Sequence, residues 1–192
     1  KDALLNKFLG IYIVAVLMLW IKTYITQKAP FELGVEGVLQ QFLLLLNPLG
    51  SAMLFLGFSF LFRGKRKYTS LVIVYTLMSI VLYANIVYYR FFSDFITLPT
   101  VTQTQNFGDL GGSVLSLLKP YDILFFVDVF VIFYLRFSRK IQKETNHSGY
   151  KKAIAIIAFA LIVSIINLGL AEVSRPQLLT RGFDRNYIVK YL

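Results

Sequence analysis

Five long apolar runs, each bounded by polar or charged residues, constrain this chain more than any other feature. They recur along the whole sequence and are nearly free of charged side chains. A bilayer core about 30 Å thick requires roughly 20 residues of helix to cross it. With 57% hydrophobic residues in this pattern, the chain is predicted to be an all-α membrane protein. The five predicted transmembrane helices cover residues 8–25, 40–62, 70–92, 121–137 and 153–172.

The distribution of charge gives these spans an orientation. With a cytoplasmic N-terminus, the inside segments carry twelve basic and two acidic side chains, and all other segments carry eight of each. Cytoplasmic loops are enriched in Lys and Arg, so the N-terminus is predicted to be cytoplasmic and, after five spans, the C-terminus extracellular. The basic runs Arg63–Lys67 and Arg136–Lys143 directly adjoin apolar helices. Topology therefore explains the basic charge, and we expect a multi-pass cell-membrane protein with no nucleic-acid partner.

The chain divides into a membrane domain and a short tail. Residues 1–173 are predicted to form the five-helix transmembrane domain, and residues 174–192 an extracellular juxtamembrane linker. Short helices are expected to lie on the outer surface, one of them at Ser113–Leu118 and another in the tail. In the tail, Arg181 and Arg185 would lie opposite an apolar stripe, which is typical of a helix in the headgroup plane. The alternative is a connector packed on the helix bundle. The stripe consists of Leu179, Phe183, Tyr187 and Tyr191.

Four polar residues lie within the spans at a similar depth. Counted at 1.5 Å per residue from the outer helix ends, they share a level about 10 Å inside the outer face. A charge inside the bilayer is costly, so Asp128 should face the bundle and have a partner, with Arg90 or Lys22 in reach. The shared depth predicts one polar cluster, either as interhelical hydrogen bonding or as a cavity for a lipid headgroup or substrate. Its members are Asn47, Asn85, Asp128 and Asn167.

The sequence lacks recognisable catalytic patterns. It has no cysteine, so disulfides and thiolate chemistry are excluded. Its one histidine, His147, lies in a basic inner loop, and no His, Asp and Glu residues have the spacing of metal ligands. We therefore predict no catalytic residue, metal ligand or cofactor in this chain, and we do not expect it to be a complete enzyme by itself. A small lipid transporter or flippase, or a membrane sensor subunit, stays open as an alternative function.

Two outer-face segments resemble the lipoteichoic acid synthase family. The first runs from Phe92 through Leu98-Pro99-Thr100 to the stretch Thr102–Gly112. The second is the tail from Arg175 to Leu192, and Leu118–Asp122 adds to the similarity. The resemblance runs along the whole chain, and five helices with an extracellular C-terminus also fit it. It implies that the chain is the N-terminal membrane domain of such a synthase.

The resemblance also implies an activity for the larger protein. Family members polymerise glycerol phosphate from phosphatidylglycerol into lipoteichoic acid at the plasma membrane of Gram-positive bacteria. An extracellular sulfatase-like domain performs this transfer with a threonine nucleophile and a divalent metal, manganese or magnesium. That domain would follow Leu192, so its catalytic residues have no counterparts here. The membrane domain would anchor and orient it and present lipid, with other cell-envelope proteins as possible partners.

Two sets of outer-face residues are candidates for contact with lipid. A basic side chain at headgroup level attracts anionic lipids, phosphatidylglycerol among them, by about 1 kcal/mol. The basic candidates are Arg90, Lys119, Arg175, Arg181, Arg185 and Lys190. The polar candidates of the outer loop are Gln103, Gln105, Asn106 and Asp109.

Overall fold

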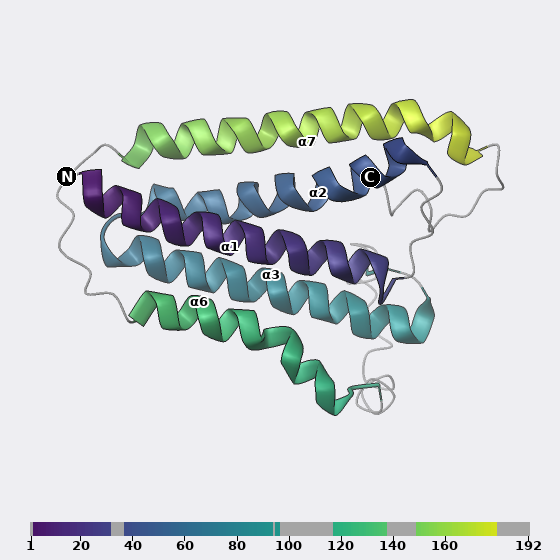
Figure 1. Cartoon of the computed structure of the whole chain (residues 1–192), viewed down its shortest axis with the longest axis horizontal. Helices are drawn as coiled ribbons and strands as arrows, with labels where there is room; N and C mark the ends of the chain where they lie inside the picture. The colour runs from purple at the N-terminus through teal and green to yellow at the C-terminus, as the bar shows by residue number, and fades with distance from the viewer. Residues whose placement is uncertain (1, 32–36, 94, 97–116, 138–148, 180–192) are drawn as a thin grey trace, which may run out of the picture.

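The chain folds into a set of long helices that lie side by side. The computed structural model describes residues 2–31, 37–93, 95–96, 117–137 and 149–179, and every regular element in these ranges is helical. The predicted all-α class is therefore confirmed for the described part of the chain. Successive long helices run in opposite directions (Figure 1). The elements are α1 (Asp2–Lys28), α2 (Val38–Gly57), η1 (Phe58–Leu61), α3 (Lys65–Phe92), η3 (Pro120–Phe126), α6 (Val127–Phe137) and α7 (Gly149–Leu179).

Four helices are long and apolar enough to cross a membrane. They comprise Phe8–Lys28, Val38–Leu61, Lys65–Phe92 and Ala153–Ala171, close to four of the predicted spans. The remaining run, predicted at 121–137, forms the 3₁₀ helix η3 followed by the 11-residue helix α6. This segment differs from the others because Asp122 accepts a hydrogen bond from the Lys119 amide and holds the first residues in a tight turn.

Helix α1 lies at the centre of the arrangement. It contacts α2, α3 and α6, whereas α7 packs on α2 and η1 at the opposite edge from α6 (Figure 1). At the N-terminal end of α1, aromatic rings from three elements meet edge to face, Phe8 with Phe60 and Tyr68 at centroid distances of 4.8 and 4.9 Å. Such edge-to-face pairs add to the stabilisation from apolar burial. This aromatic cluster fixes α1 against the η1–α3 connection.

One glycine makes that connection possible. Gly64, between η1 and α3, has a φ of +56°, a left-handed conformation that residues with a Cβ rarely adopt. At the other end of α3, Ser93 also adopts a left-handed conformation and donates its amide to the Tyr89 carbonyl at 2.9 Å. Helix α3 thus begins and ends at defined turns.

Large apolar side chains cover the outer surface of the helices. Leu77 on α3, Phe130 on α6 and Ile165 on α7 are 56%, 67% and 67% exposed. Exposed apolar side chains in this number mark an interaction surface, and on helices of this length they suit contact with lipid. The fold therefore places most apolar residues outward and leaves a thin core between the helices.

Candidate functional site

An ion pair links α1 to α6 within the apolar part of the molecule. The Lys22 ammonium lies 2.8 Å from Asp128 Oδ1, and the two side chains are only 10% and 15% exposed. Helix α3 contributes two hydroxyls: Tyr75 donates to Asp128 Oδ2 at 2.5 Å, and Lys22 donates to Ser79 Oγ at 3.1 Å. In a medium that cannot hydrate either charge, these mutual bonds offset the cost of burial.

Aromatic rings complete the surroundings of this lysine. The Lys22 Nζ atom lies 4.1 Å from the centroid of the Phe125 ring and 5.6 Å from that of Phe126, within cation–π range. A groove of about 500 Å³ runs beside the pair, with Asp128 in its wall. Its other lining residues are mostly apolar, from α1 and the η3–α6 segment. The geometry makes the pair a clamp that holds α6 against α1 and α3.

A second ion pair joins the end of α3 to η3. The two terminal nitrogens of the Arg90 guanidinium, Nη1 and Nη2, donate to the Asp122 carboxylate at 2.7 and 2.8 Å, in a parallel two-bond arrangement. Tyr83 donates to the same carboxylate at 2.8 Å, and Arg90 also donates to the Leu117 carbonyl at 3.2 Å. Bidentate pairs of this type fix orientation as well as distance. Arg90, predicted to contact lipid headgroups, thus makes three hydrogen bonds within the protein.

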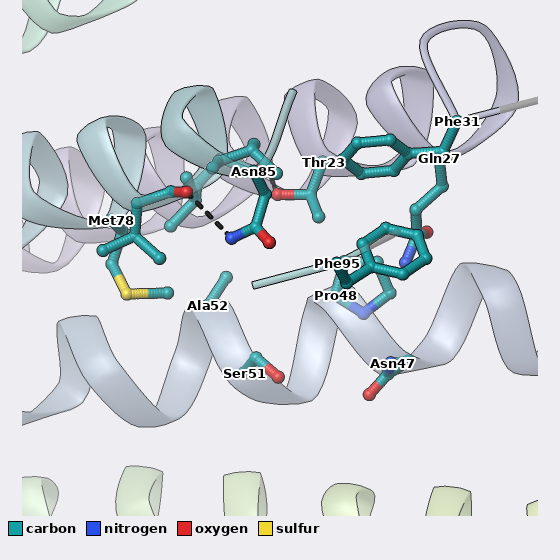
Figure 2. A pocket seen from close by; sticks show the side chains of 13 residues that line it. Thr23, Gln27, Phe31, Asn47, Pro48, Ser51, Ala52, Met78, Asn85 and Phe95 are labelled. Carbon is teal, nitrogen blue, oxygen red and sulfur yellow. Dashed lines mark hydrogen bonds between the residues drawn. The ribbon is translucent and has the colours of Figure 1, made fainter. Parts of the chain in front are cut away.

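A cavity of about 290 Å³ lies between α1, α2 and α3. Figure 2 shows Thr23 and Gln27 reaching into this region from α1, with Asn85 on α3 and Pro48 on α2. Pro48 has no amide hydrogen, so α2 lacks one internal hydrogen bond at this level. Trp20 on α1 donates its indole N–H, at 2.7 Å, to the Leu45 carbonyl on the same stretch of α2. The remaining polar lining residues are Asn47 and Ser51.

Aromatic rings close one end of the cavity. Phe31 and Phe95 both line it, and their ring centroids are 4.8 Å apart. Tyr89 packs against both rings, at 5.1 and 5.3 Å. The Ile96 amide donates to Asn85 Oδ1 at 3.0 Å, while the Asn85 amide donates to the Val81 carbonyl. Asn85 therefore holds the segment that positions Phe95.

Three of the four polar residues predicted to share one depth line two different pockets. Asn47 and Asn85 line the cavity between α1, α2 and α3, whereas Asp128 belongs to the clamp with Lys22. Asn167 is buried on α7, and its Oδ1 atom has no hydrogen-bond partner among the described residues. Depth along a helix can be counted from the sequence, but the rotation of each helix about its axis cannot.

Of the other residues predicted to contact lipid, the structure describes only Lys119 and the helix position of Arg175. The exposed Lys119 has its Nζ atom 5.5 Å from the centroid of the Tyr121 ring. Arg175 falls within α7, whose helix continues past the predicted end of its span to Leu179. Outside the described residues lie Arg181, Arg185, Lys190, Gln103, Gln105, Asn106 and Asp109.

Several residues of these sites are absent from the predicted set. Thr23 and Gln27 are four positions apart on α1, as Asn47 and Ser51 are on α2, and this spacing places each pair on one helix face. A pair of polar residues four positions apart within an apolar span could therefore have indicated from the sequence which helix faces line the cavity. The hydroxyls of Tyr75 and Tyr83 carry no such signal, because tyrosines are frequent throughout this chain.

The site chemistry is that of binding and support. Among the described residues, no three His, Asp or Glu side chains gather closely enough to hold a metal ion. The carboxylates of Asp122 and Asp128 are both occupied by a cation and by a tyrosine hydroxyl. These arrangements can fix helices and hold a small polar group.

Four apolar helices of membrane-spanning length, with an ion pair between α1 and α6 inside the apolar zone, define a polytopic helical membrane domain. The lipoteichoic acid synthase N-terminal domain model matches residues 1–192, and the chain belongs to this family. It is 45% identical over its full length to lipoteichoic acid synthase 2 of Bacillus subtilis (strain 168). Over 96% of the chain it is 43% identical to lipoteichoic acid synthase 1 of the same strain. Over 94% it is 36% identical to the lipoteichoic acid synthase of Staphylococcus aureus (strain USA300).

These matches concern one part of the larger relatives. The chain spans 28–29% of the length of each of these three synthases. No solved structure matches it. The predicted membership in the lipoteichoic acid synthase family, as its N-terminal membrane domain, is confirmed.

Proposed function

We propose that this chain is the membrane domain of a glycerophosphotransferase that polymerises glycerol phosphate from phosphatidylglycerol into lipoteichoic acid. The match to the synthase N-terminal domain along all 192 residues carries this proposal. In it, the domain anchors an extracellular, metal-dependent catalytic domain and holds it at the level of the lipid headgroups. The substrate lipid is confined to the bilayer, so an active site held there gains effective concentration over a free domain.

The proposal includes five spans. Segment η3–α6 contains seven 3₁₀ residues and eleven α-helical residues. At about 2.0 and 1.5 Å per residue, its contour length is roughly 30 Å, which equals the thickness of a bilayer core. Ile123, Leu124 and Tyr134 on this segment are 69–70% exposed. An apolar segment of this length and exposure is accounted for by contact with lipid.

The proposed orientation in the membrane rests on the basic residues at one side of the helix bundle. Basic residues gather where η1 joins α3 and where α6 ends, at the side of the molecule where α1 begins (Figure 1). The positive-inside rule assigns this side to the cytoplasm. The end of α7 then lies on the extracellular side, where a catalytic domain would be held. The basic residues in question are Arg63, Lys65, Arg66, Lys67 and Arg136.

Single-cysteine labelling tests this topology, because the chain has no cysteine of its own. In intact cells, an impermeant thiol reagent should leave Lys65→Cys and Lys143→Cys unlabelled. The same reagent should label Gly34→Cys, Gln105→Cys and Gln177→Cys, with permeabilised cells as the control for reactivity. Labelling at position 65 together with protection at position 105 would overturn the five-span orientation.

Polymer synthesis tests the function. In a synthase that carries this membrane domain, Arg181→Glu with Arg185→Glu should reduce lipoteichoic acid in cells without loss of expression or insertion. The charge reversal repels anionic headgroups that the native arginines attract. The matched control, Arg181→Lys with Arg185→Lys, should retain synthesis. Normal polymer length and yield in the charge-reversed protein would reduce the domain to a simple anchor.

A further inference from the structure

We infer that the cavity between α1, α2 and α3 binds a neutral polyol group, the class to which a glyceryl lipid headgroup and free glycerol belong. The inference rests on the proposed membrane location of the chain, but neither on its orientation nor on catalysis. The cavity volume of about 290 Å³ far exceeds the ~10–15 Å³ that a single water needs. It lies at the lower end of the range for small-molecule sites.

The lining chemistry selects an uncharged ligand. Its polar members are carboxamides and hydroxyls, and none of its lining residues carries a formal charge. A phosphate or an ammonium group would therefore enter without a counter-charge. Each hydroxyl of a polyol both donates and accepts hydrogen bonds, and so do the Gln27 and Asn47 carboxamides and the Ser51 hydroxyl. The lining thus complements a polyol and disfavours an ion.

Buried polar capacity in the cavity is left unused by the protein. The Oε1 atom of Gln27 is buried and accepts no hydrogen bond within the described part of the chain. Both polar atoms of the Asn85 side chain, in contrast, already have a partner, the Ile96 amide for Oδ1 and the Val81 carbonyl for Nδ2. An unsatisfied buried acceptor costs free energy, and native proteins rarely retain one without a purpose. In Figure 2 the Gln27 side chain extends from α1 toward Phe95 and Pro48, where a hydroxyl donor would complete it.

Aromatic walls suit the carbon side of the same ligand. Phe31 and Phe95 supply ring surface at one end, with Met78 and Leu82 from α3 beside the polar groups. A polyol has hydroxyls on its edges and C–H bonds between them, so a mixed wall of carboxamides and rings contacts both. Sites of this type combine an apolar lining with a few placed polar groups.

The chain contains its own reporter for occupancy. Trp20 is its single tryptophan, and its indole is bonded to Leu45, two positions before Asn47. We would reconstitute the chain in phosphatidylcholine vesicles and titrate 1-monooleoylglycerol, methyl oleate or free glycerol while recording Trp20 emission. The inference predicts a saturable response to monooleoylglycerol or glycerol, and the two arms separate a lipid source from a soluble one. No response to either, or an equal response to methyl oleate, would overturn it.

Two variants separate binding from structural support. Gln27→Leu removes the unpartnered acceptor, so the apparent affinity for the responding probe should fall tenfold or more while the melting temperature without probe stays equal or rises. Thr23→Val, nearly isosteric, should weaken the response at least threefold and serves if Gln27→Leu fails to fold. Thr76→Val is the matched control, because Thr76, like Thr23, donates its hydroxyl to the carbonyl four residues earlier but is not among the residues that line the cavity. A lower melting temperature with an unchanged response in Gln27→Leu would refute the site.

This assay is independent of the proposed function. It uses no catalytic domain and measures no polymer. No probe response in vesicles, together with the predicted cysteine labelling in intact cells, would eliminate the polyol site and leave the proposed topology intact. A retained probe response without the predicted labelling pattern would overturn the five-span orientation and leave the polyol site intact.

Discussion

Helices α7 and α6 attach to the rest of the molecule at opposite edges and by different chemistry. Helix α7 meets α2 through small residues: a Cβ built on Gly50 would lie 2.9 Å from the Ser164 hydroxyl. Segment η3–α6 is instead held by two ion pairs, Lys22–Asp128 and Arg90–Asp122. Lipid is as apolar as leucine, so helices in a bilayer associate through close packing or polar bonds, and this fold uses each on one edge.

The difference follows from length and shape. Helix α7 has 31 residues and lies along α2, and the close approach at Gly50 recurs two turns later at Gly57, where a Cβ would lie 3.4 Å from Ile156. Segment η3–α6 is shorter, and Phe130 and Tyr134 point outward with exposures of 67% and 70%. With less packed surface available, charge-assisted bonds supply the stabilisation. We therefore expect the α6 edge to respond to changes of charge and the α7 edge to changes of volume.

Removing one partner of the buried clamp should have the largest effect. Asp128→Leu leaves the Lys22 ammonium uncompensated, and breaking a buried pair in this way costs about 3–5 kcal/mol of unfolding free energy. Lys22→Leu with Asp128→Leu should recover most of that loss, which equilibrium unfolding in mixed micelles would measure. Asp128 and Asn85 lie in different pockets, so their effects should be additive. Strong coupling between them would contradict the separation of the two sites.

Overfilling the α2–α7 contact should come next. Gly50→Leu forces a side chain against Ser164 and Val163, and overpacking of this kind costs about 1–3 kcal/mol. Gly10→Leu is the matched control, because nothing lies within 4 Å of a Cβ at that position on α1. The same unfolding assay should show loss for the first variant and little change for the second. Equal stability of both would mean that α7 is not held by close approach.

Replacing the guanidinium at the second ion pair should give a smaller loss. Arg90→Lys retains the charge but cannot form two parallel bonds with Asp122, so we expect about 1 kcal/mol. Raising the salt concentration should change this difference little, because the Asp122 side chain is only 9% exposed. A strong salt dependence would place the pair in contact with bulk water.

The hydroxyl of Tyr83 should matter least. Tyr83→Phe removes one of the hydrogen bonds to Asp122 and leaves the Arg90 pair in place. Side-chain hydrogen bonds between membrane helices average about 0.6 kcal/mol, and we expect a loss of that order. The loss should disappear in the Asp122→Asn background only if the hydroxyl acts through this carboxylate, and a double-mutant cycle measures that coupling.

Much of the fold follows directly from the sequence. Apolar length located the four long spans, and the cost of a buried charge required a partner for Asp128, which Lys22 supplies. Hydropathy could not distinguish η3 from a full α-helix, because the 3₁₀ turn depends on the bonds of Asp122 to Lys119 and to Arg90. The first bond is local and the second is tertiary, and neither leaves a periodic trace in the sequence.

The candidate sites were less predictable than the helices. Residues at one depth need not meet, since each helix can rotate about its axis, and Asn85 and Asp128 line different pockets. The cavity also depends on Phe95, which the Asn85–Ile96 bond places against Phe31. A contact made across a loop by one backbone amide cannot be inferred from composition or spacing.

Helix α7 has a geometric consequence that concerns height and phase. Its 31 residues measure about 46 Å, against about 30 Å for the bilayer core, while its apolar stretch Ala153–Ala171 measures about 28 Å. The rest of the helix, residues 149–152 before that stretch and 172–179 after it, extends beyond the apolar length. Each residue added after that stretch would raise whatever the helix carries by about 1.5 Å and turn it by about 100°. The length of α7 therefore sets both the height above the bilayer and the rotation about the helix axis of any group attached to its end.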